Sequence, residues 1–283
     1  TASDPVANGI IIYQSTSGDA ESTTGETATF QAADSTLKSA ITSGSMFYLT
    51  NTSADVVLAR TSLDFDSSAA DLILAAGNDS NSWGTTGSNG ATVRFTGIEQ
   101  QLKGNIEADS ISSVDLHLTQ GSIWTGSASI TQNDVGSTSD APITVNIDGT
   151  SSWVVTDSCT ISALNVASGA KIVDEDGKTV TIVANGQTVV QGDSDLTVTC
   201  DSYSTSYDAS DAGTLSDDLI DRTAFDEQMG TNTTWSMGDH SAATQASATS
   251  ASASTDDEAT TQSQPETNPI IAFFQWLGGL LGL

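Results

Sequence analysis

The chain has 283 residues, of which 36 are Asp or Glu and only 7 are Lys or Arg, so its formal net charge is −29. Such a charge repels polyanions, which excludes nucleic acid and disfavours anionic lipid surfaces as partners. Abundant Gly, Ser, Thr and Asp with little Lys are typical of secreted β-rich proteins, so we expect an extracellular or cell-surface location.

Short strands with alternating apolar side chains recur along the chain, and a turn follows each one. The ranges 56–58, 93–95, 116–118 and 145–147 have the period of a strand with one buried face. Their unequal spacing argues against a fixed-period array of helices or propeller blades, and it favours stacked coils with loops of different length. Between these strands, Ser, Thr, Gly, Asn and Asp interrupt every potential amphipathic helix. The sequence therefore predicts an all-β parallel β-helix.

In chain order, polar residues 1–8 precede a first strand at 10–13, and the β-helix domain is predicted to span residues 1–200. The glycine-rich stretch 77–90 lacks the Lys and the spacing of a phosphate-binding loop, so we interpret it as a long connection pinned by Trp83. The predicted interior includes six side chains of the central strands: Val93, Phe95, Leu116, Leu118, Val145 and Ile147.

Five phrases resemble a known family: IIYQSTSGDA (11–20), MFYLTNTSADVVL (46–58), WGTTGSNGATVRFT (83–96), GNIEADSISSVDLHLTQGSIWTG (104–126) and TSSWVVTDSCTISAL (150–164). They are similar to secreted bacterial right-handed parallel β-helix proteins described as adhesin-like or carbohydrate-binding surface proteins. The resemblance covers roughly residues 9–200. It implies a β-solenoid, a surface location and a polysaccharide or cell-surface glycan as partner, but it brings no catalytic set. It also implies that more coils precede the first strand, the alternative being a short capped solenoid.

Beyond residue 200 the composition changes. Residues 201–240 are predicted to be a partly ordered polar extension with one short helix at 216–229, capped by Ser216 and stopped by Gly230. Residues 241–268 contain no sizeable apolar side chain, so they predict a disordered low-complexity spacer.

Residues 269–283 form a short apolar C-terminal segment. A helix over Ile270–Leu283, rising about 1.5 Å per residue, is too short for the roughly 30 Å hydrocarbon core of a bilayer. Three uses stay open: lying in a membrane interface, docking in an apolar groove of a protein partner, and capping the solenoid's own open end. The lack of Lys and Arg in the segment favours the two protein contacts.

Trp124 and Trp153 occupy equivalent positions in successive coils. They suit either an exposed aromatic strip that stacks on sugar rings or a pair of packed interior side chains. Arg60 and Arg94 follow or lie in strands of equivalent coils, so we expect them to stack on one face and to be further ligand-binding candidates.

Catalysis and metal binding have weak signals. The motifs of polygalacturonase-like sites are absent, and a lyase-like site would have to use Arg60 or Arg94 as its base beside Ca²⁺-holding carboxylates. D-x-D pairs occur at Asp64/Asp66, Asp174/Asp176 and Asp193/Asp195. Of these, Asp64 and Asp66 are the candidates for a structural Ca²⁺, although no complete twelve-residue calcium loop occurs. We therefore expect no enzyme and no cofactor, with a polysaccharide-degrading enzyme as the lesser alternative.

His117 lies between Leu116 and Leu118, so it is predicted to point outward as a surface histidine. Cys159 and Cys200 are the only cysteines. In an exported protein they suit either a disulfide that ties the last coils together or two separately buried thiols.

Two function classes follow from the sequence. The first is a non-catalytic, adhesin-like surface protein that binds carbohydrate or another surface ligand through one face of the solenoid. The second is a purely structural cell-surface stalk or filament scaffold. Exposure of Trp124 and Trp153 would favour the first class.

Overall fold

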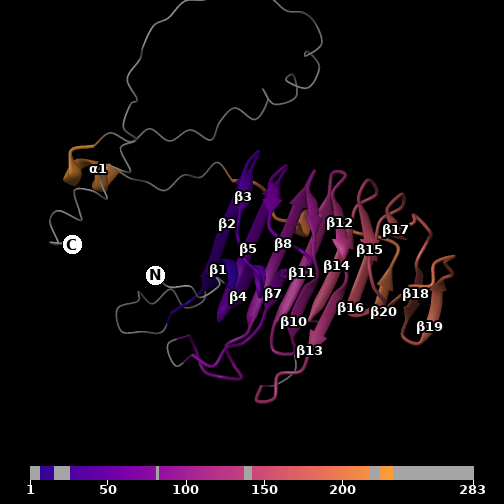
Figure 1. Cartoon of the computed structure of the whole chain (residues 1–283). Helices are drawn as coiled ribbons and strands as arrows, with labels where there is room; N and C mark the ends of the chain where they lie inside the picture. The colour runs from indigo at the N-terminus through magenta and orange to yellow at the C-terminus, as the bar shows by residue number, and fades with distance from the viewer. Residues whose placement is uncertain (1–6, 16–25, 81–82, 137–141, 217–222, 232–283) are drawn as a thin grey trace, which may run out of the picture. The chain divides into compact units, whose positions relative to one another are not determined.

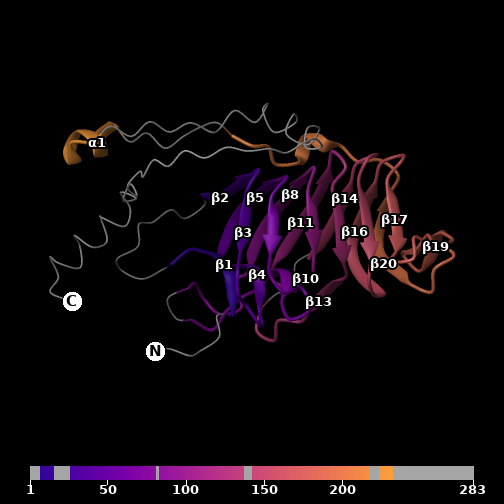
Figure 2. The same cartoon turned by 45° about the horizontal axis from the view of Figure 1, so that its top comes forward.

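The computed structural model describes residues 7–15, 26–80, 83–136, 142–216 and 223–231. They form an all-β parallel β-helix, as predicted, whose coils follow one another along the solenoid in Figures 1 and 2. Its strands are β1 (Asn8–Tyr13), β2 (Thr27–Ala33), β3 (Thr36–Lys38), β4 (Ser45–Thr50), β5 (Thr52–Ala59), β6 (Ser62–Asp64), β7 (Asp71–Ala75), β8 (Ala91–Ile98), β9 (Gln101–Lys103), β10 (Ile106–Asp109), β11 (Ser113–Thr119), β12 (Ile123–Gly126), β13 (Ala128–Thr131), β14 (Ile143–Ile147), β15 (Ser152–Val155), β16 (Cys159–Val166), β17 (Lys171–Asp174), β18 (Thr181–Ala184), β19 (Gln187–Val190) and β20 (Thr197–Ser204).

From β1 to β15, every third strand returns to the same face of the solenoid. The first sheet has the order β1-β4-β7-β10-β13, and the second sheet has the order β19-β18-β20-β16-β14-β11-β8-β5-β2. The third face consists of two separate sheets, β3-β6 and β9-β12-β15-β17. The pairs are parallel except for the hairpin between β18 and β19. The first sheet ends at β13, so the later coils add strands only to the second and third faces.

The core lies between the three faces, and its side chains stack in register from coil to coil. In the second sheet Val56 pairs with Phe95, Phe95 with Leu116, Leu116 with Val145 and Val145 with Leu164. All six predicted interior side chains are buried, which confirms the alternation of the central strands. Because like side chains lie above one another, each coil buries its apolar surface against the next one.

Left-handed corner residues end the strands of the second sheet. Asp34, Arg60, Glu99 and Gln120 have φ values of 49°, 46°, 49° and 55°. This conformation is uncommon for residues other than Gly, Asn and Asp, so the hydrogen bonds and ion pairs of the corner must hold it.

The two ends of the solenoid differ. At one end β20 inserts between β16 and β18, and the antiparallel β19 forms the edge of the second sheet. At the other end lie β1, β2 and β3 (Figures 1 and 2), whose inward side chains Ile10, Phe30 and Leu37 are only half-buried. Among the described strands, none pairs with the outer edges of this first coil.

The long connection between β7 and β8 is held where the sequence predicts. The ring of Trp83 stacks on Tyr13 with centroids 4.3 Å apart, and the Trp83 carbonyl accepts hydrogen bonds from the side chains of Asn78 and Asn89. Trp83 therefore fixes this connection to the first sheet.

Residues 205–216, which we call the strap, run back along the outer face of the second sheet (Figure 2). Tyr207 contacts His117 of β11, Asp211 contacts Arg94 of β8, and Gly213 contacts Thr96 of β8. At its end, the side chain of Gln31 in β2 exchanges two hydrogen bonds with the backbone of Ser216. The strap includes the 3₁₀ turn η1 (Ala209–Asp211) and returns the chain to the first coil.

The predicted helix is shorter than expected. It is α1 (Thr223–Met229), and Gly230 ends it with φ of 65°, as predicted. Ser216 does not cap α1, because the helix begins only at Thr223, and the backbone of Ser216 is hydrogen-bonded to Gln31. The spacer at 241–268 and the apolar segment at 269–283, with Ile270–Leu283, lie outside the described residues.

Candidate functional site

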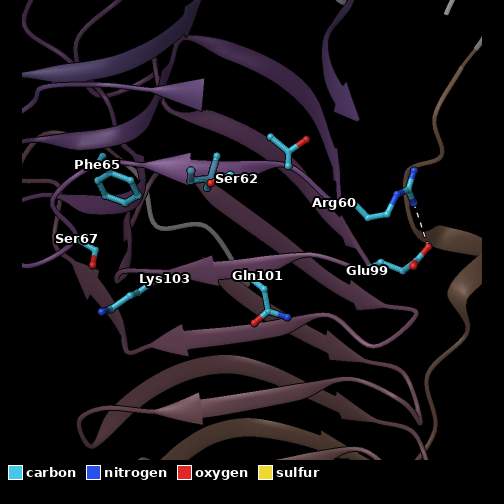
Figure 3. Close-up of a pocket in the computed structure, with 9 residues that line it drawn as sticks. Arg60, Ser62, Phe65, Ser67, Glu99, Gln101 and Lys103 are labelled. Carbon is cyan, nitrogen blue, oxygen red and sulfur yellow. Dashed lines mark hydrogen bonds and ion pairs between the residues drawn. The ribbon is translucent and has the colours of Figure 1, made fainter. Parts of the chain in front are cut away.

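A groove of about 420 Å³ opens where the third face is interrupted, between β6 and β9 (Figure 3). It is lined by a mixture of hydroxyl, amide, charged and apolar side chains: Arg60, Thr61, Ser62, Leu63, Phe65, Ser67, Glu99, Gln101 and Lys103. The strands before this point, β5 and β8, pair continuously through Ala59 and Ile98. The two coils therefore separate only after the corner.

The buried side chain of Gln100 accounts for the separation. Its Oε1 accepts a hydrogen bond from the backbone N–H of Thr61 at 2.8 Å, and its Nε2 donates to the backbone carbonyls of Thr61 at 2.5 Å and Gln101 at 2.9 Å. A carboxamide thus occupies the place where a direct backbone bond between the coils would lie. The bonds also satisfy a polar group that burial would otherwise destabilise.

Charged side chains form one rim of the groove and are held together by ion pairs. Arg60 donates to Asp34 at 2.7 Å and to Glu99 at 3.0 Å, and the Glu99 contact is visible in Figure 3. The hydrogen bond to Asp34 raises the pKa of the guanidinium above its ordinary value. Glu99 is held by Arg60, so it is poorly placed to act as a proton acceptor.

The opposite rim carries Lys103, Ser67 and the half-buried ring of Phe65 (Figure 3). Lys103 forms none of the ion pairs found within the described residues, although its charge acts on Asp66. Gln101, Ser62 and Lys103 are exposed, so their polar groups face solvent in the open groove. The lining offers hydrogen bonds and one aromatic surface to a ligand.

Arg94 does not belong to this groove, so the prediction that Arg60 and Arg94 stack together is wrong. Arg60 is a corner residue after β5, whereas Arg94 lies within β8 opposite Asp55 and forms an ion pair with it. Arg94 also donates to the Asp211 carbonyl, so it fastens the strap.

Trp124 and Trp153 are fully buried, so the alternative of a packed interior pair is confirmed and that of an exposed sugar-binding strip is wrong. Their rings stack with centroids 4.6 Å apart inside the core. The indole N–H of Trp124 donates to the Gly104 carbonyl, and that of Trp153 donates to the Gly126 carbonyl. Both polar groups are satisfied internally, so these side chains pack the third face and face no ligand.

The Asp64 and Asp66 pair is not assembled as a metal site. Asp64 forms an ion pair with Lys38, and Asp66 accepts hydrogen bonds from Ser68, which lower the pKa of Asp66. Within the described ranges no three His, Cys, Asp or Glu side chains come together as metal ligands. Asp64 thus forms a surface ion pair, and Asp66 stabilises the turn after β6.

His117 points outward from the coil, as the alternation predicts, but it is not a surface histidine. The strap covers it, leaving it 1% exposed, and its Nδ1 lies 2.8 Å from the hydroxyl of Tyr207. Its Nε2 lies 3.2 Å from Asp115, but among the described residues this nitrogen has no hydrogen bond of good geometry. Burial raises the pKa of the Tyr207 phenol, which keeps it protonated.

Cys159 and Cys200 are free thiols in the structure, Cys200 buried and Cys159 half-buried, so of the two alternatives the disulfide is not formed. The register explains this, because Cys159 lies opposite Val198 and Cys200 lies opposite Ile161. With parallel strands about 4.8 Å apart and a rise of about 3.3 Å per residue, such diagonal neighbours lie about 8 Å apart, beyond the usual Cα separation of a disulfide. Burial raises the pKa of Cys159 to about 11, so it is unreactive at neutral pH.

The sequence did not single out Phe65, Ser62, Gln100, Gln101 or Lys103. In the sequence, the one signal that could have brought these residues together is that Thr61 and Gln100 occupy equivalent positions after β5 and β8. No local pattern indicates that the side chain of Gln100 replaces strand pairing there.

No helix of the described residues is long and apolar enough to cross a membrane. No protein-family model matches the chain, and no curated protein or solved structure matches it significantly.

Proposed function

We propose that the solenoid is a non-catalytic, extracellular surface domain that binds glycan, in the manner of an adhesin, through the groove between β6 and β9. The observation that supports this most is the lining of the groove. It joins the partly exposed ring of Phe65 to hydroxyl, amide and ammonium groups of β6, β9 and the turn after β6.

Sugar rings offer a ring of hydroxyl groups and an apolar face, and this lining suits both. Ser62, Ser67 and Gln101 provide hydrogen-bond donors and acceptors, and Phe65 provides a surface on which a pyranose can stack. Ligand sites commonly combine an apolar surface with a few placed polar groups.

The electrostatics favour a neutral ligand. The net charge of −29 repels a polyanionic polysaccharide, and Arg60 is already occupied by Asp34 and Glu99. A neutral glycan avoids this repulsion, and it does not have to break the ion pairs of the rim.

Binding is tested with a glycan array followed by calorimetry on the full chain. We expect Phe65→Ala and Gln101→Ala each to weaken binding about tenfold or more, equivalent to about 1.4 kcal/mol. Val189→Ala serves as the matched control, since Val189 is an exposed apolar side chain on β19 at the opposite end. Because Phe65 also packs against the core, thermal melting accompanies its variant, while the exposed Gln101 makes no such contact.

Absence of any glycan hit for the unmodified protein would contradict the proposal and leave the structural stalk as the better function. Binding that survives both groove variants would place the glycan elsewhere on the solenoid.

A further inference from the structure

The gap between β6 and β9 leaves particular backbone groups facing it. In β6, Ser62 donates its N–H to Ser35 and Asp64 accepts from Ser39, so both direct their groups toward β3. Backbone groups of successive strand residues alternate in direction, so those of Leu63 point across the gap. Leu63 therefore presents one N–H and one carbonyl to the groove.

The facing strand is arranged in the same way. The Gln100 carbonyl accepts from Ile123 of β12, and Gly104 donates to Thr125, so the residues between them alternate toward and away from β12. The groups of Gln101 and Lys103 consequently point toward β6. A continuous sheet would join Lys103 N–H to the Leu63 carbonyl, but β6 and β9 are not paired.

Gln100 indicates what kind of group fits this gap. Its carboxamide accepts from one strand and donates to both, through the contacts with Thr61 and Gln101 described above. At this end of the gap the space between the strands is thus filled by one amide. The next position along the gap lies between Leu63 and Lys103. It offers a backbone N–H from Lys103 and a backbone carbonyl from Leu63, and no side-chain amide of the described residues lies between them.

We infer that the groove selects glycans bearing N-acetylated amino sugars, and this rests on the proposed glycan-binding function. The acetamido carbonyl accepts from the backbone N–H of Lys103, and the acetamido N–H donates to the backbone carbonyl of Leu63. The pyranose ring then lies toward Phe65 on the groove wall. The group is neutral, so the acidic chain does not repel it.

An amide suits this position better than a hydroxyl does. An amide presents its donor and its acceptor on opposite sides, so it spans two separated strands, whereas a hydroxyl presents both from one oxygen. An extended peptide also carries amides, but β6 and β9 are only three residues long each. Strand addition draws its affinity from a run of main-chain bonds, which these short edges do not provide.

Three trimers with the same β-1,4 linkage test the inference: N-acetylglucosamine, glucose and glucosamine. They differ only in carrying an acetamido, a hydroxyl or an ammonium group at C2. Calorimetry on the full chain is expected to give at least tenfold tighter binding of the N-acetylglucosamine trimer. In ¹H–¹⁵N spectra, this trimer is expected to shift the amide signals of Leu63 and Lys103 more than the other two do.

Two substitutions at one position separate the backbone from the side chain. Lys103→Pro removes the N–H that faces the groove on an edge strand, where proline is tolerated, and Lys103→Ala retains that N–H. We expect Lys103→Pro to lose the preference for the acetylated trimer and Lys103→Ala to keep it. The amide shifts of the unmodified protein provide the same test if the proline variant does not fold.

The outcomes distinguish this inference from the function on which it rests. Equal affinity for the acetylated and the glucose trimer, or an unshifted Lys103 amide in the complex, would overturn the selectivity and leave glycan binding intact. Binding of an extended peptide with no binding of any glycan would overturn both.

Discussion

The side chain of Asp148 stabilises a corner by accepting several hydrogen bonds at once. One oxygen accepts from the backbone N–H of Gln120 at 2.6 Å, and the other accepts from the backbone and hydroxyl of Thr150 at 2.9 and 2.8 Å. Burial works to raise the pKa of Asp148, but these hydrogen bonds outweigh it and hold the pKa below its ordinary value. The ionised carboxylate therefore stabilises the folded chain.

Asp148→Asn is expected to lower the free energy of unfolding by about 1 kcal/mol at pH 7, a modest value because the side chain is partly exposed. A lowered folded-state pKa contributes stability above the unfolded value, and that stability is lost as the pH falls through the folded value. The difference between variant and wild type should therefore shrink below about pH 4. Denaturant titrations at several pH values measure it.

Asp193→Asn is the control, because Asp193 is exposed and its carboxylate makes no hydrogen bond found among the described residues. It should change stability little at any pH. A destabilisation by Asp148→Asn that is independent of pH would show that the carboxylate charge is unimportant.

Single residues show how far the sequence could be interpreted. Alternation correctly predicted that His117 points away from the coil, but its burial depends on Tyr207, which lies far along the chain. The positions of Trp124 and Trp153 were correctly recognised as equivalent. Equivalence alone does not say whether a stacked pair faces the core or solvent, and the burial in the structure decides it.

The strap is held against the second sheet at a point where only glycine fits. A Cβ at Gly213 would lie 2.8 Å from Asp55 Oδ1, 2.8 Å from Val57 Cγ2 and 3.1 Å from Thr96 Oγ1. Gly213 also donates its backbone N–H to the Thr96 hydroxyl. A larger side chain there would force the strap away from the sheet.

Gly213→Val is expected to lift the strap and to cost roughly 1–3 kcal/mol of stability, as overpacking does. Hydrogen exchange should become faster in residues 205–216, while the core strands β8 and β11 stay protected. Ala209→Val, in an exposed position of the same strap, should change neither. Faster exchange throughout the second sheet would mean that the strap and the sheet unfold as one unit.

Elements with a strong period were predictable, and those without one were not. The strands around Phe95, Leu116 and Val145 alternate apolar and polar residues, so both their existence and their buried face followed from the sequence. The strap carries no such period, because polar contacts such as Arg94 to Asp211 hold it. The break between β6 and β9 was missed for a related reason, since one side chain, Gln100, creates it.

At the scale of the whole molecule, we expect no pectin-degrading activity. Such a reaction needs a free base or acid beside the sugar, but Arg60 and Arg94 are both held in ion pairs with carboxylates. Incubation with polygalacturonate, with and without Ca²⁺, should release neither reducing nor unsaturated ends. Release that disappears in an Arg60→Gln or Arg94→Gln variant would contradict this expectation.

The strap brings the chain after β20 back to the first described coil. The described strands begin at Asn8 in the first coil, and Ser216 is bound to Gln31 in that same coil. A force applied at Ser216 would therefore reach the solenoid at the coil that contains Gln31, and not at the end formed by β18 and β19.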